Sequence, residues 1–157
     1  AEPVVFVASP AFWAQKYAEC EKNGTVKWST KTVGQEEISV RQITLDQILQ
    51  EPFFLTEKNA NYRQALDQHL ASCRCCLSPV LEISDTAFII QMLEQSRGLS
   101  FLPLFAVQKQ IWEGTLAAVE VDDVEISMYR QIFYHKNKFR TREMEQFIIF
   151  ASEEENH

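Results

Sequence analysis

The sequence predicts an α/β fold in which a mostly parallel sheet is flanked by helices. From Thr44 onward, short apolar runs alternate with stretches of helical periodicity, and this alternation is typical of parallel strands joined by crossover helices. Near the N-terminus, Val4–Ala8 is apolar without a break, as in a strand whose two faces are both buried. A length of 157 residues suits one domain with a proper hydrophobic core.

Before Thr44, the chain is predicted to hold a short helix and a two-stranded ribbon. Residues 11–21 are expected to form the helix, and Asn23–Gly24 is a strong turn signal. Residues 25–30 and 38–43 then alternate between apolar and polar side chains. That alternation predicts two strands of a ribbon, each with one covered face.

Strands and helices are expected to alternate along the rest of the chain. Five apolar runs bounded by turn residues are predicted strands: Phe53–Thr56, Val80–Ile83, Leu99–Leu102, Thr115–Val121 and Met128–His135. Four helices are expected to begin at residues whose side chains accept free backbone N–H groups: Thr44, Asn61, Ser84 and Thr141. Gly98 is expected to end the third of these as its C′ residue. A further helix is predicted from Pro103 to about Trp112.

The charge of the chain argues against direct contact with DNA. Its formal net charge is −7 and its pI is near 5.0, whereas a DNA-binding surface needs basic residues that neutralise phosphates. No apolar run is long enough to span a bilayer, and we find no secretory signal. Three of the four cysteines fall within Cys73–Cys76. This spacing is unlike a disulfide framework and favours reduced thiols and a cytoplasmic location.

Several segments in a fixed order carry a resemblance to a known family. Ile83–Thr86 opens a helix, and Gly98–Val107 then follows a glycine with an apolar strand closed by a proline. Glu113–Leu116 looks like a glycine–x–leucine step into the next strand. Together they resemble the effector domain of LysR-type bacterial transcription regulators. Neighbouring parts of that domain are similar to three further segments: Leu45–Thr56, Ile132–Lys136 and Met144–Phe150.

This resemblance implies a lobe of the type 2 periplasmic-binding-protein kind, with a small-molecule effector bound in a cleft between two lobes. It assigns residues 1–120 mainly to the second subdomain, with an unusual segment at 11–42. It assigns residues 121–157 to the strand and helix that return to the first subdomain. The implied partners are a small polar or anionic effector, other copies of the chain, and DNA through a winged helix-turn-helix absent from this sequence. No catalytic activity, cofactor or membrane contact is implied.

The effector is expected to contact residues that follow the predicted strands, because α/β folds bind ligands at strand ends. The candidates are Thr56, Lys58, Asn59, Asn61, Tyr62, Ser84, Asp85, Thr86, Leu104 and Phe105. Their hydroxyl, amide and backbone N–H groups suit a carboxylate or another polar ligand. These residues also have structural alternatives: Asn61 and Ser84 as helix caps, Asp85 as a charge that complements the helix dipole, and Leu104 and Phe105 as core residues.

Two other functions stay open at the level of the sequence. A periplasmic-type solute-binding protein would share the fold but requires export. A redox or metal sensor could use His69, Cys73, Cys75 and Cys76, because His69 and Cys73 share a helical face and offer ligands for zinc or copper. Small buried thiols at a helix end are the simpler explanation. No nucleophile elbow, phosphate-binding glycine loop or paired-histidine helix indicates an enzyme.

Overall fold

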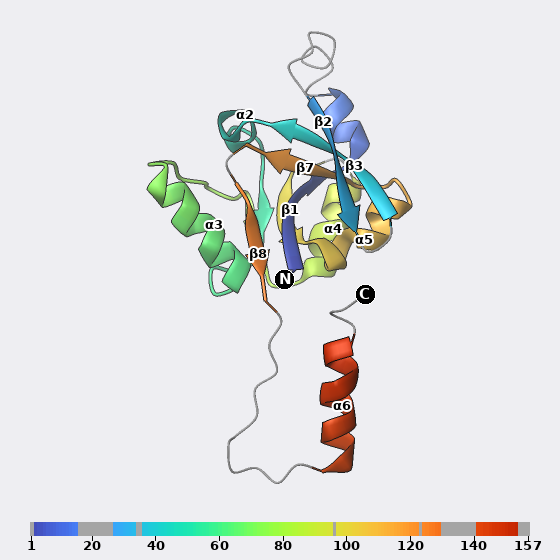
Figure 1. The fold of residues 1–157 in the computed structure, drawn as a ribbon. Helices are drawn as coiled ribbons and strands as arrows, with labels where there is room; N and C mark the ends of the chain where they lie inside the picture. The colour runs from blue at the N-terminus through green and yellow to red at the C-terminus, as the bar shows by residue number, and fades with distance from the viewer. Residues whose placement is uncertain are drawn as a thin grey trace.

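The fold is built around one mixed sheet (Figure 1). The structure is a computed structural model that describes residues 2–15, 27–33, 36–95, 97–122, 124–129 and 141–153. The strands of this sheet are β1 (Glu2–Ala8), β2 (Lys27–Val33), β3 (Glu36–Ile43), β6 (Ser100–Pro103), β7 (Ala117–Val121) and β8 (Ile126–Met128). Their order is β2-β3-β7-β1-β6, with β8 paired to β1. The predicted α/β class is therefore confirmed.

The strand directions differ from the mostly parallel sheet that the sequence predicts. β1 runs antiparallel to β6, β7 and β8, and β2 runs antiparallel to β3. A parallel direction is found between β3 and β7, and between the strands of a small second sheet, β4 (Phe54–Leu55) and β5 (Leu81–Glu82). The prediction failed because an unbroken apolar run reports burial on both faces of a strand but does not encode the direction of its neighbours.

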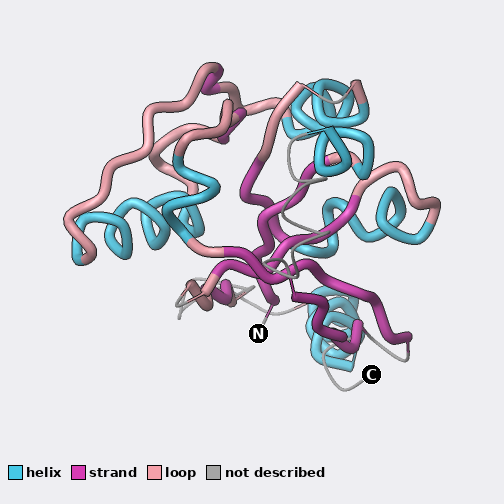
Figure 2. The backbone as a smooth tube through the Cα atoms, turned by 90° about the horizontal axis from the view of Figure 1, so that it is seen from above, coloured by secondary structure: helices cyan, strands magenta, loops and turns pink. Residues whose placement is uncertain are grey.

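The two faces of β1 contribute to two separate core clusters. Phe6 packs in the first cluster with Leu66 and Leu70 of α3 (Asn61–Ser72). Val7 packs in the second cluster with Ile89 of α4 (Thr86–Glu94) and Val107 of α5 (Leu104–Trp112). Figure 2 shows helices on either side of the central strands. This two-sided burial explains why the sequence of β1 is apolar without a break.

The ribbon and the first helices largely follow the sequence. β2 and β3 pair along their length, as predicted for residues 25–30 and 38–43. Residues 10–15 are helical, and the remainder of the helix predicted over 11–21 lies outside the described residues, as does the Asn23–Gly24 turn. α2 (Leu45–Leu49) begins after Thr44 as predicted, and the Thr44 N–H donates to Gln47 Oε1 at 3.0 Å. Part of the strand predicted over Met128–His135 also lies outside the described residues.

Two of the four predicted N-caps are wrong by one residue. α3 has Ala60 as its N-cap, and Asn61 is its first helical residue. α4 has Asp85 rather than Ser84 as its N-cap, and the Asp85 carboxylate accepts a hydrogen bond from the Phe88 N–H at 3.1 Å. At α4, Ser84 and Asp85 are equally good caps in isolation, so the packing of the helix decides which of them adopts the extended conformation. At α3 the extended residue is Ala60, which has no capping side chain, so cap preference does not set where this helix begins.

Gly98 is required for a close approach of two backbone segments, and the predicted C′ role is wrong. α4 ends at the C-cap Gln95, and the positive-φ glycine among the described residues is Gly114. A Cβ at Gly98 would collide with the carbonyl oxygen of Pro52 and with the Phe54 ring. The same carbonyl accepts a hydrogen bond from the Leu99 N–H at 2.9 Å. Gly98 therefore allows β6 to lie against the segment that leads into β4.

The C-terminal helix, α6 (Arg142–Glu153), lies apart from the sheet in Figure 1. Thr141 caps it as predicted, because its Oγ1 accepts a hydrogen bond from the Met144 N–H at 3.3 Å. Hydrogen bonds from its own backbone and from Thr141 hold the pKa of the Glu143 carboxyl below its usual value. The apolar side chains of Phe147, Ile149 and Phe150 are exposed. Among the described helices, none has the length and apolar character to cross a membrane.

Replacing Gly98 by alanine should lower the free energy of unfolding by about 1–3 kcal/mol, because the methyl group meets backbone atoms rather than a flexible side chain. Urea denaturation of the purified chain measures the loss. Gly114→Ala is the matched control: its φ is +73° and nothing lies within 4 Å of the new Cβ, so it should lose only about 1 kcal/mol from backbone strain. A larger loss for Gly114→Ala than for Gly98→Ala would contradict the close-approach explanation.

Candidate functional site

Three parallel strands end at one edge of the fold. Leu55 of β4 is in register with Glu82 of β5, and a parallel bridge joins Phe53 to Leu99 at the start of β6. The carboxyl ends of β4, β5 and β6 therefore point the same way, and α3, α4 and α5 begin just beyond them. We call this the strand-end edge. It is formed by three segments: residues 56–62, 83–86 and 103–105.

The segment after β4 carries five of the residues predicted as ligand contacts. Thr56 is buried, and its Oγ1 has no hydrogen-bond partner among the described residues. Lys58 and Asn59 lie in an exposed turn, and Asn61 is exposed at the start of α3. Tyr62 is half-buried, with its ring centroid 6.5 Å from that of Phe101. Thr56 is thus a buried hydroxyl at a strand end, between a polar turn and the core.

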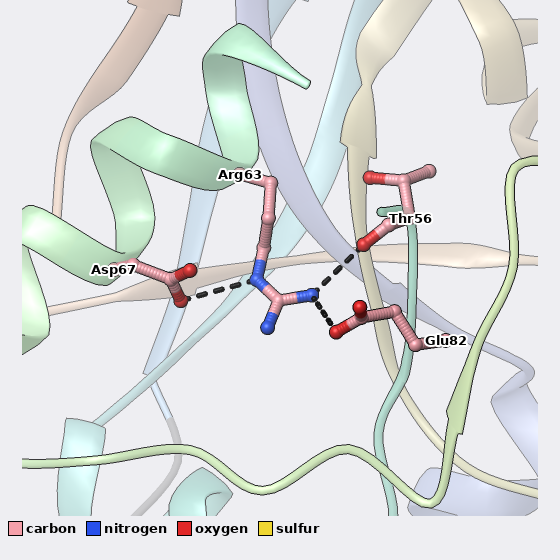
Figure 3. A network of polar contacts seen from close by, with 4 residues as sticks. All are labelled: Thr56, Arg63, Asp67 and Glu82. Atoms are coloured by element: carbon pink, nitrogen blue, oxygen red, sulfur yellow. Dashed lines mark hydrogen bonds and ion pairs between the residues drawn. The ribbon is translucent and has the colours of Figure 1, made fainter. Parts of the chain in front are cut away.

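A buried arginine holds this segment in place (Figure 3). Arg63 of α3 is 2% exposed, and its Nη1 donates to the Thr56 carbonyl oxygen at 2.8 Å and to Glu82 Oε2 at 3.3 Å. Its Nε donates to Asp67 Oδ1 at 3.1 Å. One guanidinium thereby joins α3 to the ends of β4 and β5, and it offsets its own burial with hydrogen bonds to two carboxylates and a carbonyl.

Sequence reasoning missed Arg63, although the sequence held a signal for it. Arg63 and Asp67 are four residues apart in a predicted helix, a spacing that pairs them. That spacing usually indicates a solvated surface pair. Only the fold reveals that Arg63 points inward, toward the Thr56 carbonyl and Glu82.

The segments after β5 and β6 differ in exposure. Ser84 and Asp85 are exposed, and Thr86 is half-buried. Leu104 is buried within the second core cluster, and Phe105 is about half exposed. A further aromatic ring, Phe88 in the first turn of α4, is 40% exposed and was not among the predicted contacts.

The helix N-termini at the strand-end edge are unequal in their capping. α3 and α5 have no side-chain cap, and their N-cap residues are Ala60 and Pro103. α4 is capped by the Asp85 carboxylate. Uncapped N-termini present backbone N–H groups and the positive end of the helix dipole. The N-termini of α3 and α5 are therefore suited to an anionic or hydrogen-bond-accepting group. At the N-terminus of α4, the Asp85 carboxylate already occupies this position.

His69 and the cysteines lie at the opposite end of α3 from the strand-end edge. Cys73 Sγ is 3.8 Å from His69 Nε2. Cys73 and Cys76 are exposed, and Cys75 is half-buried. In the part of the chain that the structure describes, no group of three or more metal-ligating side chains comes together.

A sheet covered by helices on both faces, with helix N-termini gathered at one strand-end edge, is an arrangement in which α/β proteins bind ligands. Residues 37–155 match the family model described as the LysR substrate binding domain. The chain therefore belongs to the family of effector-binding domains of LysR-type transcription regulators, as its sequence motifs indicate.

A curated protein of similar sequence is also a transcription regulator. The chain is 24% identical over 119 residues to the HTH-type transcriptional activator CmpR of Synechocystis sp. (strain ATCC 27184 / PCC 6803 / Kazusa), covering 74% of this chain and 39% of CmpR. It thus spans well under half of the length of this curated relative.

Two solved structures share the fold at low sequence identity. The regulatory domain of CcmR from Synechocystis PCC6803, in complex with 2-PG, has a TM-score of 0.61 at 14% identity, covering 95% of this chain and 61% of that one. The effector-binding domain of QuiR in complex with shikimate has a TM-score of 0.59 at 11% identity, covering 96% of this chain and 59% of that one.

Replacing Arg63 by methionine should lower the free energy of unfolding by about 2–3 kcal/mol. The substitution leaves the Thr56 carbonyl without its donor, and the loss is moderated because Asp67 and Glu82 are about a third exposed. Chemical denaturation measures it. The matched control is Lys109→Met, which removes an exposed ion pair to Glu113 and should change the stability by less than about 0.5 kcal/mol. Equal effects of the two substitutions would show that the Arg63 network adds no stability.

Proposed function

We propose that this chain senses a small polar or anionic effector at the strand-end edge, as part of a LysR-type transcription regulator. The observation that carries the proposal is the Thr56 hydroxyl, which is buried at the end of β4 without a partner among the described residues. A buried hydroxyl without a hydrogen bond is costly. A ligand that accepts or donates a hydrogen bond there would remove that cost.

The surrounding groups suit an anion with an apolar part. The uncapped N-terminus of α3 begins five residues after Thr56 and offers backbone N–H groups to a carboxylate or phosphate. Lys58 and Asn59, in the exposed turn between them, add a cation and an amide. Phe88 and Phe105, both partly exposed in the first turns of α4 and α5, offer apolar surface. Shikimate, bound by the fold relative QuiR, combines a carboxylate with a carbon ring.

Ser84, Asp85 and Thr86 would set the other boundary of the binding site. The Asp85 carboxylate is engaged by the Phe88 N–H, and its charge disfavours a second anionic group near α4. The site we propose therefore prefers a ligand with its negative charge on the α3 side and hydroxyl groups toward Asp85. Leu104 packs in the second core cluster and would support the binding site from its core side.

In the regulator that we propose, the effector shifts the arrangement of two lobes and thereby of a homo-oligomer. A ligand achieves this only if it binds one arrangement better than the other. Residues 1–120 would form mainly the second lobe, and residues 121–157 would return to the first. DNA would be bound by a winged helix-turn-helix outside this sequence, since the chain has a net charge of −7. We place the protein in the cytoplasm and assign it no catalytic activity.

The gene sequence tests the regulator against a solute-binding protein of the same fold. Upstream of the codon for Ala1, a regulator should encode a basic winged helix-turn-helix, whereas a solute-binding protein should encode a secretory signal. Sequencing the upstream reading frame distinguishes the two. A signal peptide there would overturn the proposed function.

Replacing Thr56 by valine in the intact regulator should weaken effector binding about tenfold, which corresponds to one hydrogen bond of about 1.4 kcal/mol. The free energy of unfolding without effector should not fall, because the lost hydroxyl has no partner in the described structure. Titration calorimetry measures the affinity for an effector found by screening small carboxylates and phosphates, shikimate among them.

The control makes the same substitution at the other end of α4 and α5. Thr115 Oγ1 donates to Glu94 Oε1 at 3.0 Å, close to the C-termini of these helices. Thr115→Val should leave the affinity unchanged. An unchanged affinity for Thr56→Val as well would remove Thr56 from the site.

A further inference from the structure

The C-terminus of α3 carries a cluster of thiols that the proposed effector site does not use. We propose that Cys73 and Cys76 form a dithiol that hydroperoxides oxidise reversibly to a disulfide, with His69 as the group that takes the proton of the Cys73 thiol. Both cysteines are free and exposed. The proposal goes beyond the effector-sensing function and does not depend on it.

The backbone turns sharply between the two cysteines. Cys73 is the C-cap of α3, and Arg74 follows with a φ of 57°. The Arg74 N–H donates to the Ala71 carbonyl at 3.1 Å, and the Cys75 N–H donates to the Leu70 carbonyl at 2.8 Å. This pair of bonds is a Schellman motif, in which glycine is the usual C′ residue. The turn reverses the chain within the Cys-x-x-Cys spacing typical of redox dithiols.

The burial pattern selects Cys76 rather than Cys75 as the partner of Cys73. Beyond the turn, residues 75–80 alternate between half-buried and exposed. Cys75 packs against the first core cluster, and its thiol donates to the Cys73 carbonyl oxygen at 3.5 Å. Cys76 lies on the outward side of the same segment. The two exposed thiols, those of Cys73 and Cys76, therefore both face solvent.

His69 and Ser72 give the Cys73 thiol a polar environment. Cys73 Sγ lies 3.8 Å from His69 Nε2, on the preceding turn of α3, and 3.8 Å from Ser72 Oγ. When Nε2 is the unprotonated ring atom, it is placed to take the thiol proton as the sulfur attacks an oxidant. Arg74 adds a positive charge at a position where glycine would cost less strain. Thiolates next to histidine and arginine are the cysteines that oxidants attack.

The chemistry balances with a hydroperoxide as the oxidant. The Cys73 sulfur attacks the distal oxygen while His69 takes the thiol proton and passes it to the leaving oxygen. The O–O bond breaks, and the products are a sulfenic acid on Cys73 and an alcohol, or water from hydrogen peroxide. The Cys76 thiol then attacks the Cys73 sulfur and displaces water as the S–S bond forms. Two thiols are oxidised, and one peroxide is reduced. Reduction by a dithiol restores both cysteines by thiol–disulfide exchange.

A metal site is the competing use of the same residues, and the structure favours it less. Zinc or copper would need at least one further ligand beside His69 and Cys73, and no group of three gathers in the described part of the chain. A disulfide needs only the two exposed thiols. It would close a ring across residues 73–76 and so restrict the segment that leads from α3 into β5, where Glu82 meets Arg63.

Peptide mapping of the purified chain tests the pairing directly, because Arg74 lies between the two cysteines. Trypsin separates residues 64–74, which contain Cys73, from residues 75–97, which contain Cys75 and Cys76. After brief treatment with hydrogen peroxide, we expect the two peptides to stay joined, to lose two hydrogens in mass, and to separate on reduction. A vicinal Cys75–Cys76 bond, a bond to Cys20, or no disulfide would each overturn the proposal.

Single serine variants resolve the order of the steps. Cys75→Ser is the control and should form the same joined peptides. Cys76→Ser should stop at a Cys73 sulfenic acid that dimedone labels, and Cys73→Ser should form no bond. His69→Gln should slow the loss of the Cys73 thiol about tenfold at neutral pH without changing the product. An unchanged rate would exclude His69 from the mechanism, and stoichiometric zinc on the reduced wild-type chain would overturn the redox assignment.

Discussion

The Arg63 guanidinium ties together the parts of this fold that no long strand pairing connects. β4 and β5 are two residues long each, so their own ladder contributes few hydrogen bonds. Arg63 joins the Thr56 carbonyl to Glu82 and, through Asp67, to its own helix. The position of the strand-end edge therefore depends on one buried cation, because its charge stays in the interior only while these partners remain aligned.

The rest of the sheet supports this arrangement through β1. Its residues alternate between two core clusters, so the same strand anchors α3 on one face and α4 and α5 on the other. Gly98 then lets the segment before β6 approach Pro52, which aligns the start of β6 with that of β4. Once these alignments are made, three helices begin at one edge. A ligand there meets backbone N–H groups that come from segments far apart in sequence.

Much of the local structure was predictable from residue patterns. Thr44 and Thr141 were correctly identified as caps, since each is followed by a helix and neither has an adjacent residue that is a good cap. At α4 the cap was misplaced by one residue, to Ser84, because its neighbour Asp85 suits a cap equally well and packing chooses between them. At α3 the predicted cap Asn61 lies one residue inside the helix, which begins after Ala60, a residue without a capping side chain. The three segments expected to meet at strand ends do lie at one edge, because their strands are mutually parallel even though β1 is not.

By itself, the sequence determined the family, the α/β class, the order of most elements and the three segments that end at the strand-end edge. These follow from periodicity, caps and short motifs, which are local properties of the chain. Only the tertiary structure decided the direction of β1 relative to its neighbours, the reason for Gly98, and the inward orientation of Arg63. Each of these depends on atoms that are distant in sequence, since a carbonyl such as that of Thr56 or Pro52 leaves no trace in residue identity.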